Sequence, residues 1–380
     1  MISVTLEEQY FSEMRLVSSK TDAEMQFIAD ELSRDSAVRN ISQPAIDLIR
    51  KRAQSGRPKL RPLVFVVASA SQPSAIPRHI VRLAAISELI NIATYLLNLS
   101  IDRKGGQNGG DRPNQWLSGI VLESFCLKLI ENVSDISTDT KLVIFDSFSN
   151  GFRKVTEGLA FDIGEMSDVE RCLSYELNQF LKLYIRRCEL LGGASLQAIC
   201  LAASSVSGCD ENRRAALVRY GQMHGLALQV INDVADFVPV TRSGKSVGKC
   251  AEDRFADLRN HRVTLPVFQF CKQTSLEERN HLFGQGNIPR TEAAREMMHM
   301  LNKVDAFSAA VQLATVADSI AFEALLPLDD QFGDLLRLSL HVSQSNRFFR
   351  YLLRHGVLNG ATDVQRDQII RETLEASLIK

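Results

Sequence analysis

The chain has 380 residues, of which 45% are hydrophobic and 23% are charged, as in an ordinary soluble globular protein. Its 44 lysines and arginines nearly balance its 45 aspartates and glutamates, so no overall field favours nucleic acid or an anionic membrane. The seven cysteines include no C-x-x-C pair, which argues against a disulfide framework or a structural zinc site and indicates a reducing compartment.

The N-terminal sequence carries acidic residues where a secretion signal needs a basic flank followed by an apolar run. No stretch approaches the roughly 18 apolar residues that a membrane-spanning helix requires. We therefore expect a cytoplasmic protein that has no membrane span and binds no nucleic acid.

Helical periodicity dominates the chain, because apolar residues recur at spacings of three and four with few polar interruptions. Residues 1–45 are more polar and are expected to form a peripheral segment. The main helices are predicted at 76–99, 120–133, 142–159, 169–191, 194–206, 213–238, 293–322 and 331–353. Alternating Val/Ile/Thr-rich runs between tight turns are absent from the sequence, so strands are at most incidental.

Three polar segments that contain glycine are predicted to be loops, at 102–112, 240–249 and 285–289. We find no internal repeat and no shift in composition that would mark a second domain. The expected organisation is an all-α domain at 46–355, preceded by the segment 1–45 and followed by a C-terminal tail or helix at 356–380.

The most informative polar residues lie near the end of the helix predicted at 213–238. They are linked to one another by steps of three and four residues: Gln229, Asn232, Asp233 and Asp236. This spacing places the four side chains on one face of an otherwise apolar helix. A carboxylate pair at i and i+3 can ligate Mg²⁺, which takes oxygen ligands and keeps waters for a phosphate-bearing substrate. The alternative is an acidic face that meets solvent, and the short pattern alone favours neither.

Two cations follow this helix and shift the balance. Lys245 lies twelve residues after Asp233 in a glycine loop, and Arg262 directly precedes the sequence V-T-L-P. Lysine provides a point charge and arginine a planar fork of donors, so both suit a diphosphate held by a metal. The combination favours a metal-diphosphate site.

These residues resemble the trans-isoprenyl diphosphate synthase (polyprenyl synthetase) family. The family pattern is G-x-x-x-G-x-x-x-Q-x-x-D-D-x-x-D, then G-K, then D-L-x-x-x-K-x-T-L-P. The chain matches it at Gly221, Gly225, Gln229, Asn232, Asp233, Asp236, Gly244, Lys245, Asp257, Leu258, Thr264, Leu265 and Pro266. Asn232 stands where the family has its first aspartate, which keeps a carbonyl ligand and loses a charge.

Two other family landmarks are present in altered form. The opening G-G-K-R-x-R-P keeps Lys59 and Arg61 here, but Pro58 replaces the first lysine, which would contact isopentenyl diphosphate. The K-T pair that helps to hold the allylic diphosphate corresponds to Arg187 and Cys188. Arginine can still grip a phosphate, whereas cysteine is a poorer hydrogen-bonding group than threonine.

The first aspartate motif of the family is the main departure. Its pattern E-x-x-H-x-x-S-L-x-x-D-D-x-x-D corresponds here to Glu88, Asn91, Asn98, Leu99 and Asp102. Only the last aspartate survives, because Leu99 cannot ligate a metal and Asn98 brings no charge. The first wall of the expected site is therefore largely dismantled.

Other residues are candidates to replace what this wall has lost. Arg112 follows a glycine-rich run that stands in place of the family's R-R-G and is a candidate phosphate-binding residue. Asp102, Asp111 and Asp162 are candidate substitute metal ligands.

The resemblance implies an isoprenoid-synthase-type helical bundle around a central cavity, with Mg²⁺ as the cofactor and an allylic prenyl diphosphate as the substrate. It also implies a homodimer, or a heterodimer with an intact paralogue. It assigns catalysis to Asp233, Asp236, Arg187 and Lys245, metal binding to Asp233, Asp236, Asn232 and Asp102, and substrate binding to Lys59, Arg61, Asn91, Arg112, Gln229 and Arg262.

Three functions are consistent with this pattern. The first is a diverged prenyltransferase or terpene-synthase-like enzyme of isoprenoid biosynthesis, with an altered acceptor or cyclisation chemistry. The second is a non-catalytic or regulatory subunit of a heteromeric prenyl diphosphate synthase, and the third is a protein that binds prenyl lipids without turnover. The retained second motif and its cations favour the enzyme, whereas the lost first motif favours the subunit, because fewer metal ligands mean a slower reaction. On the sequence alone the enzyme comes slightly ahead.

Overall fold

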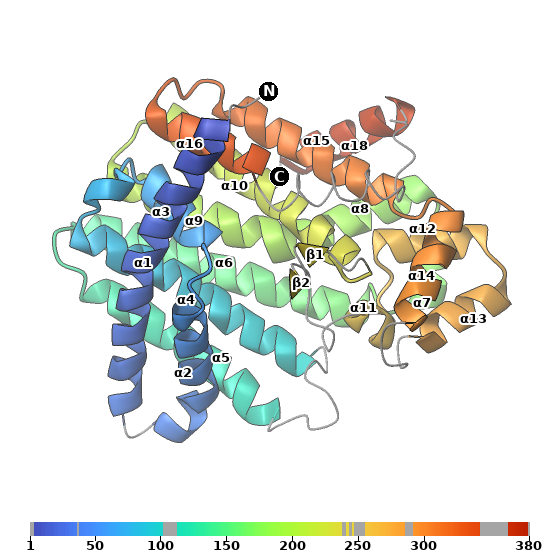
Figure 1. Ribbon diagram of the computed structural model, residues 1–380, viewed down its shortest axis with the longest axis horizontal. Helices are drawn as coiled ribbons and strands as arrows, with labels where there is room; N and C mark the ends of the chain where they lie inside the picture. The colour runs from blue at the N-terminus through green and yellow to red at the C-terminus, as the bar shows by residue number, and fades with distance from the viewer. Residues whose placement is uncertain are drawn as a thin grey trace.

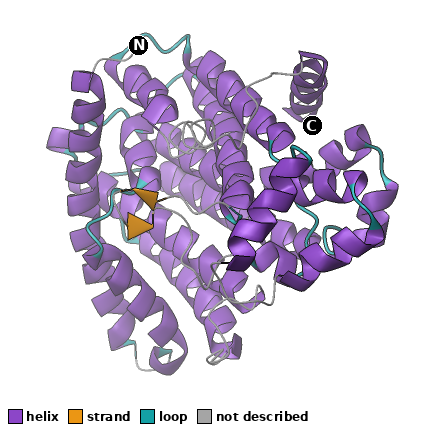
Figure 2. Ribbon diagram, turned by 45° about the vertical axis from the view of Figure 1, so that its right-hand side comes forward, coloured by secondary structure: helices purple, strands orange, loops and turns teal. Residues whose placement is uncertain are grey.

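A computed structural model describes residues 4–35, 38–101, 112–237, 241–242, 245–246, 255–285, 292–342 and 364–378. Within these residues the protein is built almost entirely from helices packed side by side, as Figures 1 and 2 show. The described strands are a two-residue antiparallel pair, β1 (Thr241–Arg242) and β2 (Lys245–Ser246), in the predicted polar loop. The predicted all-α fold class is confirmed.

The described helices follow one another in chain order. They are α1 (Val4–Arg34), α2 (Arg39–Gln54), α3 (Leu60–Ala68), η1 (Pro73–Ala75), α4 (Arg78–Ile101), α5 (Arg112–Glu131), α6 (Thr138–Gly164), α7 (Val169–Ser174), α8 (Leu177–Cys188), η2 (Glu189–Gly193), α9 (Ala194–Ser207), α10 (Glu211–Ala235), α11 (Ala256–Arg259), α12 (Leu265–Gln273), α13 (Leu276–Gln285), α14 (Glu292–Lys303), α15 (Ser308–Leu325), α16 (Gln331–Val342) and α18 (Val364–Leu378).

The core is a continuous layer of apolar side chains shared by the long helices. α10 packs against α9 and α15, α6 packs against α9, and α4 packs against α5. α1 also contributes to this core, through the buried side chains of Tyr10, Val17, Met25 and Ile28. The long central helices thus run side by side and bring polar residues near their ends into a common region.

Within the described residues, two helical stretches are long and apolar enough to cross a membrane. They are α4 and the continuous stretch Leu177–Ser207, with 72% and 56% of their most apolar windows buried inside the protein. Polar and charged residues interrupt both stretches, so neither is the unbroken apolar run by which the sequence would predict a membrane span. A helix that is apolar nearly all round is also what the centre of a large bundle requires, so these two helices fit the core.

The helix predicted at 169–191 is interrupted in the structure. α7 ends at Ser174, and α8 begins after Glu176, whose side chain and that of Gln179 form a reciprocal capping box. Such a box satisfies amide groups that a helix start leaves free, so it stabilises a new start within the apolar pattern. α8 then continues through the π-helical turn η2 into α9.

The helix predicted at 293–322 is likewise two helices, α14 and α15. Asp305 adopts a left-handed backbone conformation (φ 51°) between them, and its side chain accepts a hydrogen bond from the Ser308 hydroxyl. Aspartate tolerates this conformation better than most residues. The periodicity of the apolar residues continues across the break, which is why the sequence pattern did not show it.

Two glycines bring α10 into backbone contact with η2. A Cβ atom on Gly192 would lie 2.1 Å from the carbonyl oxygen of Gly225, and one on Gly225 would lie 2.4 Å from that of Gly192. Only glycine fits at such a distance, so the G-x-x-x-G pattern of α10 has a packing reason. The contact draws the end of α8 towards α10, which places Arg187 beside Asp233.

Candidate functional site

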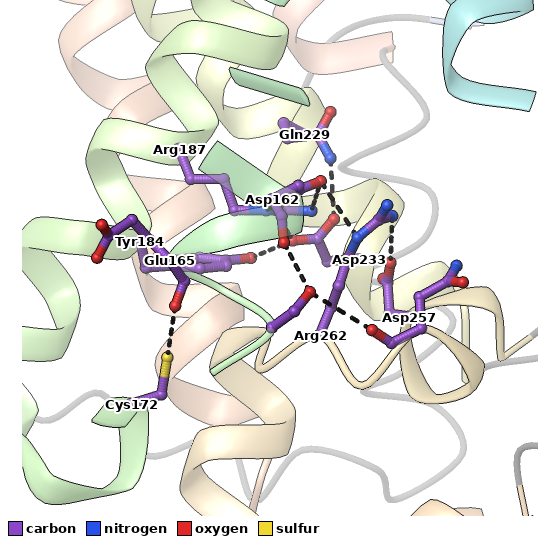
Figure 3. A network of polar contacts seen from close by, with 11 residues as sticks. Asp162, Glu165, Cys172, Tyr184, Arg187, Gln229, Asp233, Asp257 and Arg262 are labelled. Carbon is purple, nitrogen blue, oxygen red and sulfur yellow. Dashed lines mark hydrogen bonds and ion pairs between the residues drawn. The ribbon is translucent and has the colours of Figure 1, made fainter. Parts of the chain in front are cut away.

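Arg187 lies at the centre of a buried network of charged side chains (Figure 3). Its Nη1 lies 2.5 Å from Asp233 Oδ2 on α10, while its Nε donates to Asp162 Oδ1 on α6. Its Nη2 also donates to Asp162 Oδ2, at 3.4 Å. All three side chains are at most 2% exposed. The guanidinium is thus engaged by two carboxylates of the same chain.

Asp233 accepts hydrogen bonds on both of its carboxylate oxygens. The hydroxyl of Tyr184 donates to Oδ2 at 2.7 Å, and Nε2 of Gln229 donates to Oδ1 at 2.9 Å. Burial and the charge of Asp233 raise the pKa of Tyr184 well above its usual value, so the phenol keeps its proton and donates it. Burial alone would lower the pKa of Arg187, but Asp162 and Asp233 outweigh it and raise that pKa.

Removing the Tyr184 hydroxyl is expected to destabilise the protein. In Tyr184→Phe, Asp233 loses one donor to a buried carboxylate, which costs about 1–3 kcal/mol of unfolding free energy. Tyr175→Phe is the matched control, because its hydroxyl only accepts a bond from Arg171 at the surface. Urea denaturation followed by circular dichroism measures both variants. Equal stability of Tyr184→Phe and the unaltered protein would show that the bond contributes nothing.

Arg262 and Asp257 extend the buried network around Arg187 and Asp162. Arg262 Nε lies 3.6 Å from Asp162 Oδ2, and its Nη1 lies 3.5 Å from Asp257 Oδ1. The backbone amide of Asp257 donates to Asp236 Oδ2 at 3.2 Å. Asp162, a candidate substitute ligand in the sequence, is therefore a partner of two arginines.

The polar face predicted on α10 is divided between interior and surface. Asp233 and Asp236 are fully buried, Gln229 is half-buried and Asn232 is exposed. The helical spacing places the four residues on one side of the helix. Because α6, α8 and the segment before α12 pack around the two aspartates, these are buried while Asn232 stays exposed.

Of the two predicted cations near the start of α3, Lys59 is paired within the chain, whereas Nε of Arg61 is buried without a hydrogen-bond partner among the described residues. Lys59 is 7% exposed, and its Nζ lies 2.6 Å from Asp22 Oδ1 on α1. Burial lowers the pKa of Arg61, and Arg52 lowers it further while Glu88 opposes the shift. Glu88 itself is held by Arg52 at 2.7 Å.

Sequence reasoning missed Tyr184, Asp22 and Arg52 as members of these clusters. Tyr184 lies three residues before Arg187, so the helical period could have placed both on one face. Asp22 and Arg52 carry no such local signal. Only the packing of α1 and α2 against α3 and α4 brings them to Lys59 and Glu88.

The remaining predicted residues are placed in part. Asn91 is half-buried on α4, and its carbonyl accepts a bond from the Thr94 hydroxyl. Arg112 begins α5 and Lys245 lies in β2, but their side chains are outside the described part of the structure. Asp102 and Asp111 lie outside the described residues entirely.

The described side chains do not fit a Mg²⁺ site. No group of three or more His, Cys, Asp or Glu residues in the described part of the chain is arranged to hold a metal ion. Both oxygens of Asp233 already accept hydrogen bonds, from Arg187 and Tyr184 on Oδ2 and from Gln229 on Oδ1, so a metal there would compete with these donors. Of the two neighbours in its motif, Asn232 brings no charge, while the carboxylate of Asp236 is buried and already accepts from a backbone amide.

The interior between α4, α6 and α9 is nearly filled. A cavity of about 10 Å³ remains there, lined by Ser87, Ile90, Thr94, Phe148, Gly151, Phe152, Val155, Ser195, Ala198 and Ile199. This is about the room for one water molecule, whereas sites for small molecules measure about 300–1,000 Å³. The central cavity expected from the resemblance is closed at this place.

Comparison with known sequences identifies related proteins. Heptaprenyl diphosphate synthase component 2 of Bacillus subtilis (strain 168) is 27% identical over 181 residues, which is 45% of this chain and 49% of that protein. Its counterpart from Geobacillus stearothermophilus is 22% identical over 341 residues, or 86% of this chain and 99% of that protein. The chain spans about half the length of the first curated relatives that it matches.

Solved structures share the fold of the chain. Geranylgeranyl pyrophosphate synthetase from Pyrococcus horikoshii Ot3 aligns with a TM-score of 0.68 at 18% identity, covering 88% of this chain and 97% of that one. A decaprenyl diphosphate synthase from Rhodobacter capsulatus aligns with a TM-score of 0.64 at 18% identity, covering 90% and 98%. Residues 111–304, just over half of the chain, match the polyprenyl synthetase family model. The chain belongs to the polyprenyl synthetase family, whose named members are prenyl diphosphate synthases.

Proposed function

We propose that the chain is a non-catalytic subunit of a heteromeric prenyl diphosphate synthase, in which an intact homologue supplies the metal-binding aspartates. The observation that carries the proposal is the position of Arg187. This cation corresponds to the family's grip on the allylic diphosphate, and here it is buried between Asp162 and Asp233.

A diphosphate could reach Arg187 only by replacing these two carboxylates. Asp162 and Asp233 would then remain in the interior without their main cation, and uncompensated buried charges cost several kcal/mol. The phosphate would have to recover that cost before any net binding. The network therefore opposes diphosphate binding at this position.

The other half of the family's site is opposed in the same way. Lys59, which the resemblance assigns to substrate, is paired with Asp22 on α1, and Glu88 of the first-motif pattern is paired with Arg52. The first aspartate motif has lost two of its three carboxylates, and the second motif has lost one, at Asn232. The interior cavity of about 10 Å³ leaves no room for a prenyl chain at that place.

Retention of Asp233, Asp236 and the nearby cations favours the enzyme on sequence grounds, but it also has a structural explanation, because Arg187 and Arg262 are paired with buried aspartates. This pairing supports the subunit over the enzyme. Two relatives are named as components of a heptaprenyl diphosphate synthase, which supports a role beside a partner chain.

Turnover assays test the proposal. The purified protein, incubated with Mg²⁺ and geranyl, farnesyl or geranylgeranyl diphosphate, with or without isopentenyl diphosphate, is expected to release no pyrophosphate. The positive control is an intact homologue from the same genome, assayed under the same conditions. When the two chains are produced together, we expect them to co-purify and to form products of altered yield or chain length.

Two results would contradict this function. One is pyrophosphate release by the purified chain alone, provided that release is lost in Asp236→Asn, which removes a carboxylate without changing its size. The other is the absence of any complex with every intact homologue of the genome, as judged by co-purification and light scattering.

A further inference from the structure

A cleft of about 710 Å³ lies between α7 and α13. These helices gather with α14 at one end of the molecule (Figure 1). The cleft is lined by Val169, Glu170, Leu173, Ser174, His261, Leu276, Arg279, Asn280, Phe283 and Gly284. Its volume lies within the range of about 300–1,000 Å³ that is usual for sites of small molecules. None of the residues that hold Arg187 lines it.

The walls of the cleft present apolar surface to solvent. Leu276 is 70% exposed, more than any other large hydrophobic side chain in the described part of the chain. Val169, Leu173 and Phe283 are half-buried around it. Exposed apolar groups that gather in a concave place are typical of a binding site, because a ligand that covers them removes them from water.

Four polar side chains that line the cleft are available to a ligand. Glu170, His261, Arg279 and Asn280 make no side-chain hydrogen bond and no ion pair with the described residues. Arg279 is the arginine that lines the cleft, and its planar guanidinium suits an anionic group.

One wall of the cleft is held rigidly. His261 has a left-handed backbone (φ 54°), and its ring stacks on Phe283 with centroids 5.6 Å apart. The turn is closed by a bond from the His261 amide to the Leu258 carbonyl, at 3.0 Å. The amide of Val263 donates to the Met166 carbonyl at 2.8 Å, which ties the wall to the chain before α7. A fixed wall lowers the entropy that a ligand loses on binding.

We propose that the cleft between α7 and α13 binds a small amphipathic anion. The apolar body of the ligand lies against Leu276 and Phe283, and its negatively charged group lies on Arg279. Glu170, on the facing helix, repels a second negative charge, so the site selects a ligand with one anionic group.

The test uses 1-anilinonaphthalene-8-sulfonate, an aromatic anion whose fluorescence rises in an apolar site, titrated into the full-length protein. Arg279→Gln and Leu276→Asp are expected to weaken its binding about tenfold or more, because each removes one of the two contacts. Glu170→Gln is expected to strengthen binding by about two- to threefold, because it removes a repulsive charge. Rising salt should weaken binding to the unaltered protein but have less effect on Arg279→Gln.

Leu326→Asp is the matched control, because Leu326 is 58% exposed and does not line the cleft. It should bind the dye as the unaltered protein does, and circular dichroism should show the same helical content for all variants. The proposal is overturned if Arg279→Gln and Leu276→Asp bind the dye normally. It is equally overturned if Leu326→Asp loses binding to the same extent.

Discussion

Replacing Arg187 by methionine is expected to lower the free energy of unfolding by about 3–5 kcal/mol, because Asp162 and Asp233 would stay buried without their cation. Burial makes the loss large, since water cannot reach either carboxylate in place of the guanidinium. Guanidinium chloride denaturation followed by circular dichroism measures it. Of the substitutions proposed, Arg187→Met should lower the free energy of unfolding the most.

Arg186→Met is the matched control for this prediction. The side chain of Arg186 is 56% exposed and forms a surface ion pair with Glu157 at 2.8 Å. Such pairs contribute at most about 1 kcal/mol, so the control should remain close to the unaltered protein. A similar loss in both variants would mean that the buried network is not the cause.

A compensated variant separates the charge effect from the packing effect. Arg187→Met combined with Asp162→Asn and Asp233→Asn removes the cation together with both carboxylates. Replacing a whole buried ion-pair group by neutral residues of similar volume is often tolerated, so much of the lost stability should return. If the triple variant is as unstable as Arg187→Met, steric fit rather than charge holds the site together.

Gly225→Ala is expected to lower the unfolding free energy by about 3 kcal/mol, at the upper end of the usual cost of overpacking. The new Cβ would lie 2.4 Å from the Gly192 carbonyl oxygen, so α10 would have to move away from η2. Because that contact sets Arg187 beside Asp233, the buried ion pair should weaken as well. Thermal and chemical denaturation measure the change.

Gly164→Ala is the control for this substitution, because a Cβ there meets no atom within 4 Å. Alanine favours a helix over glycine by up to about 1 kcal/mol, so this variant should be equally stable or slightly more stable. A loss in Gly164→Ala comparable to that in Gly225→Ala would show that the close approach of the two backbones is not responsible.

The consequence for function is that retained aspartates do not by themselves indicate a metal site. Asp233 and Arg187 match positions that the family uses for diphosphate, yet in this chain they bind each other. Stability measurements and turnover assays address the two roles separately. A network that proves essential for folding but supports no pyrophosphate release is the combined outcome we expect.

Much of the architecture could be predicted from apolar periodicity, because a helix repeats its buried face every three to four residues wherever it lies. α4, α6, α9 and α10 were all found near their true bounds. The breaks inside 169–191 and 293–322 were missed, because capping by Glu176 and the left-handed Asp305 leave the apolar period unchanged.

What the sequence determined by itself is the family, the all-α fold class and the identity of the charged residues. Their pairing was decided only by the tertiary structure: Arg187 and Asp233 are 46 positions apart, and Lys59, just before α3, pairs with Asp22 on α1. A carboxylate that could bind a metal and one that neutralises an arginine have the same local pattern. The difference lies in which charge the packed helices bring within about 3 Å, because that neighbour occupies the oxygens in the folded chain.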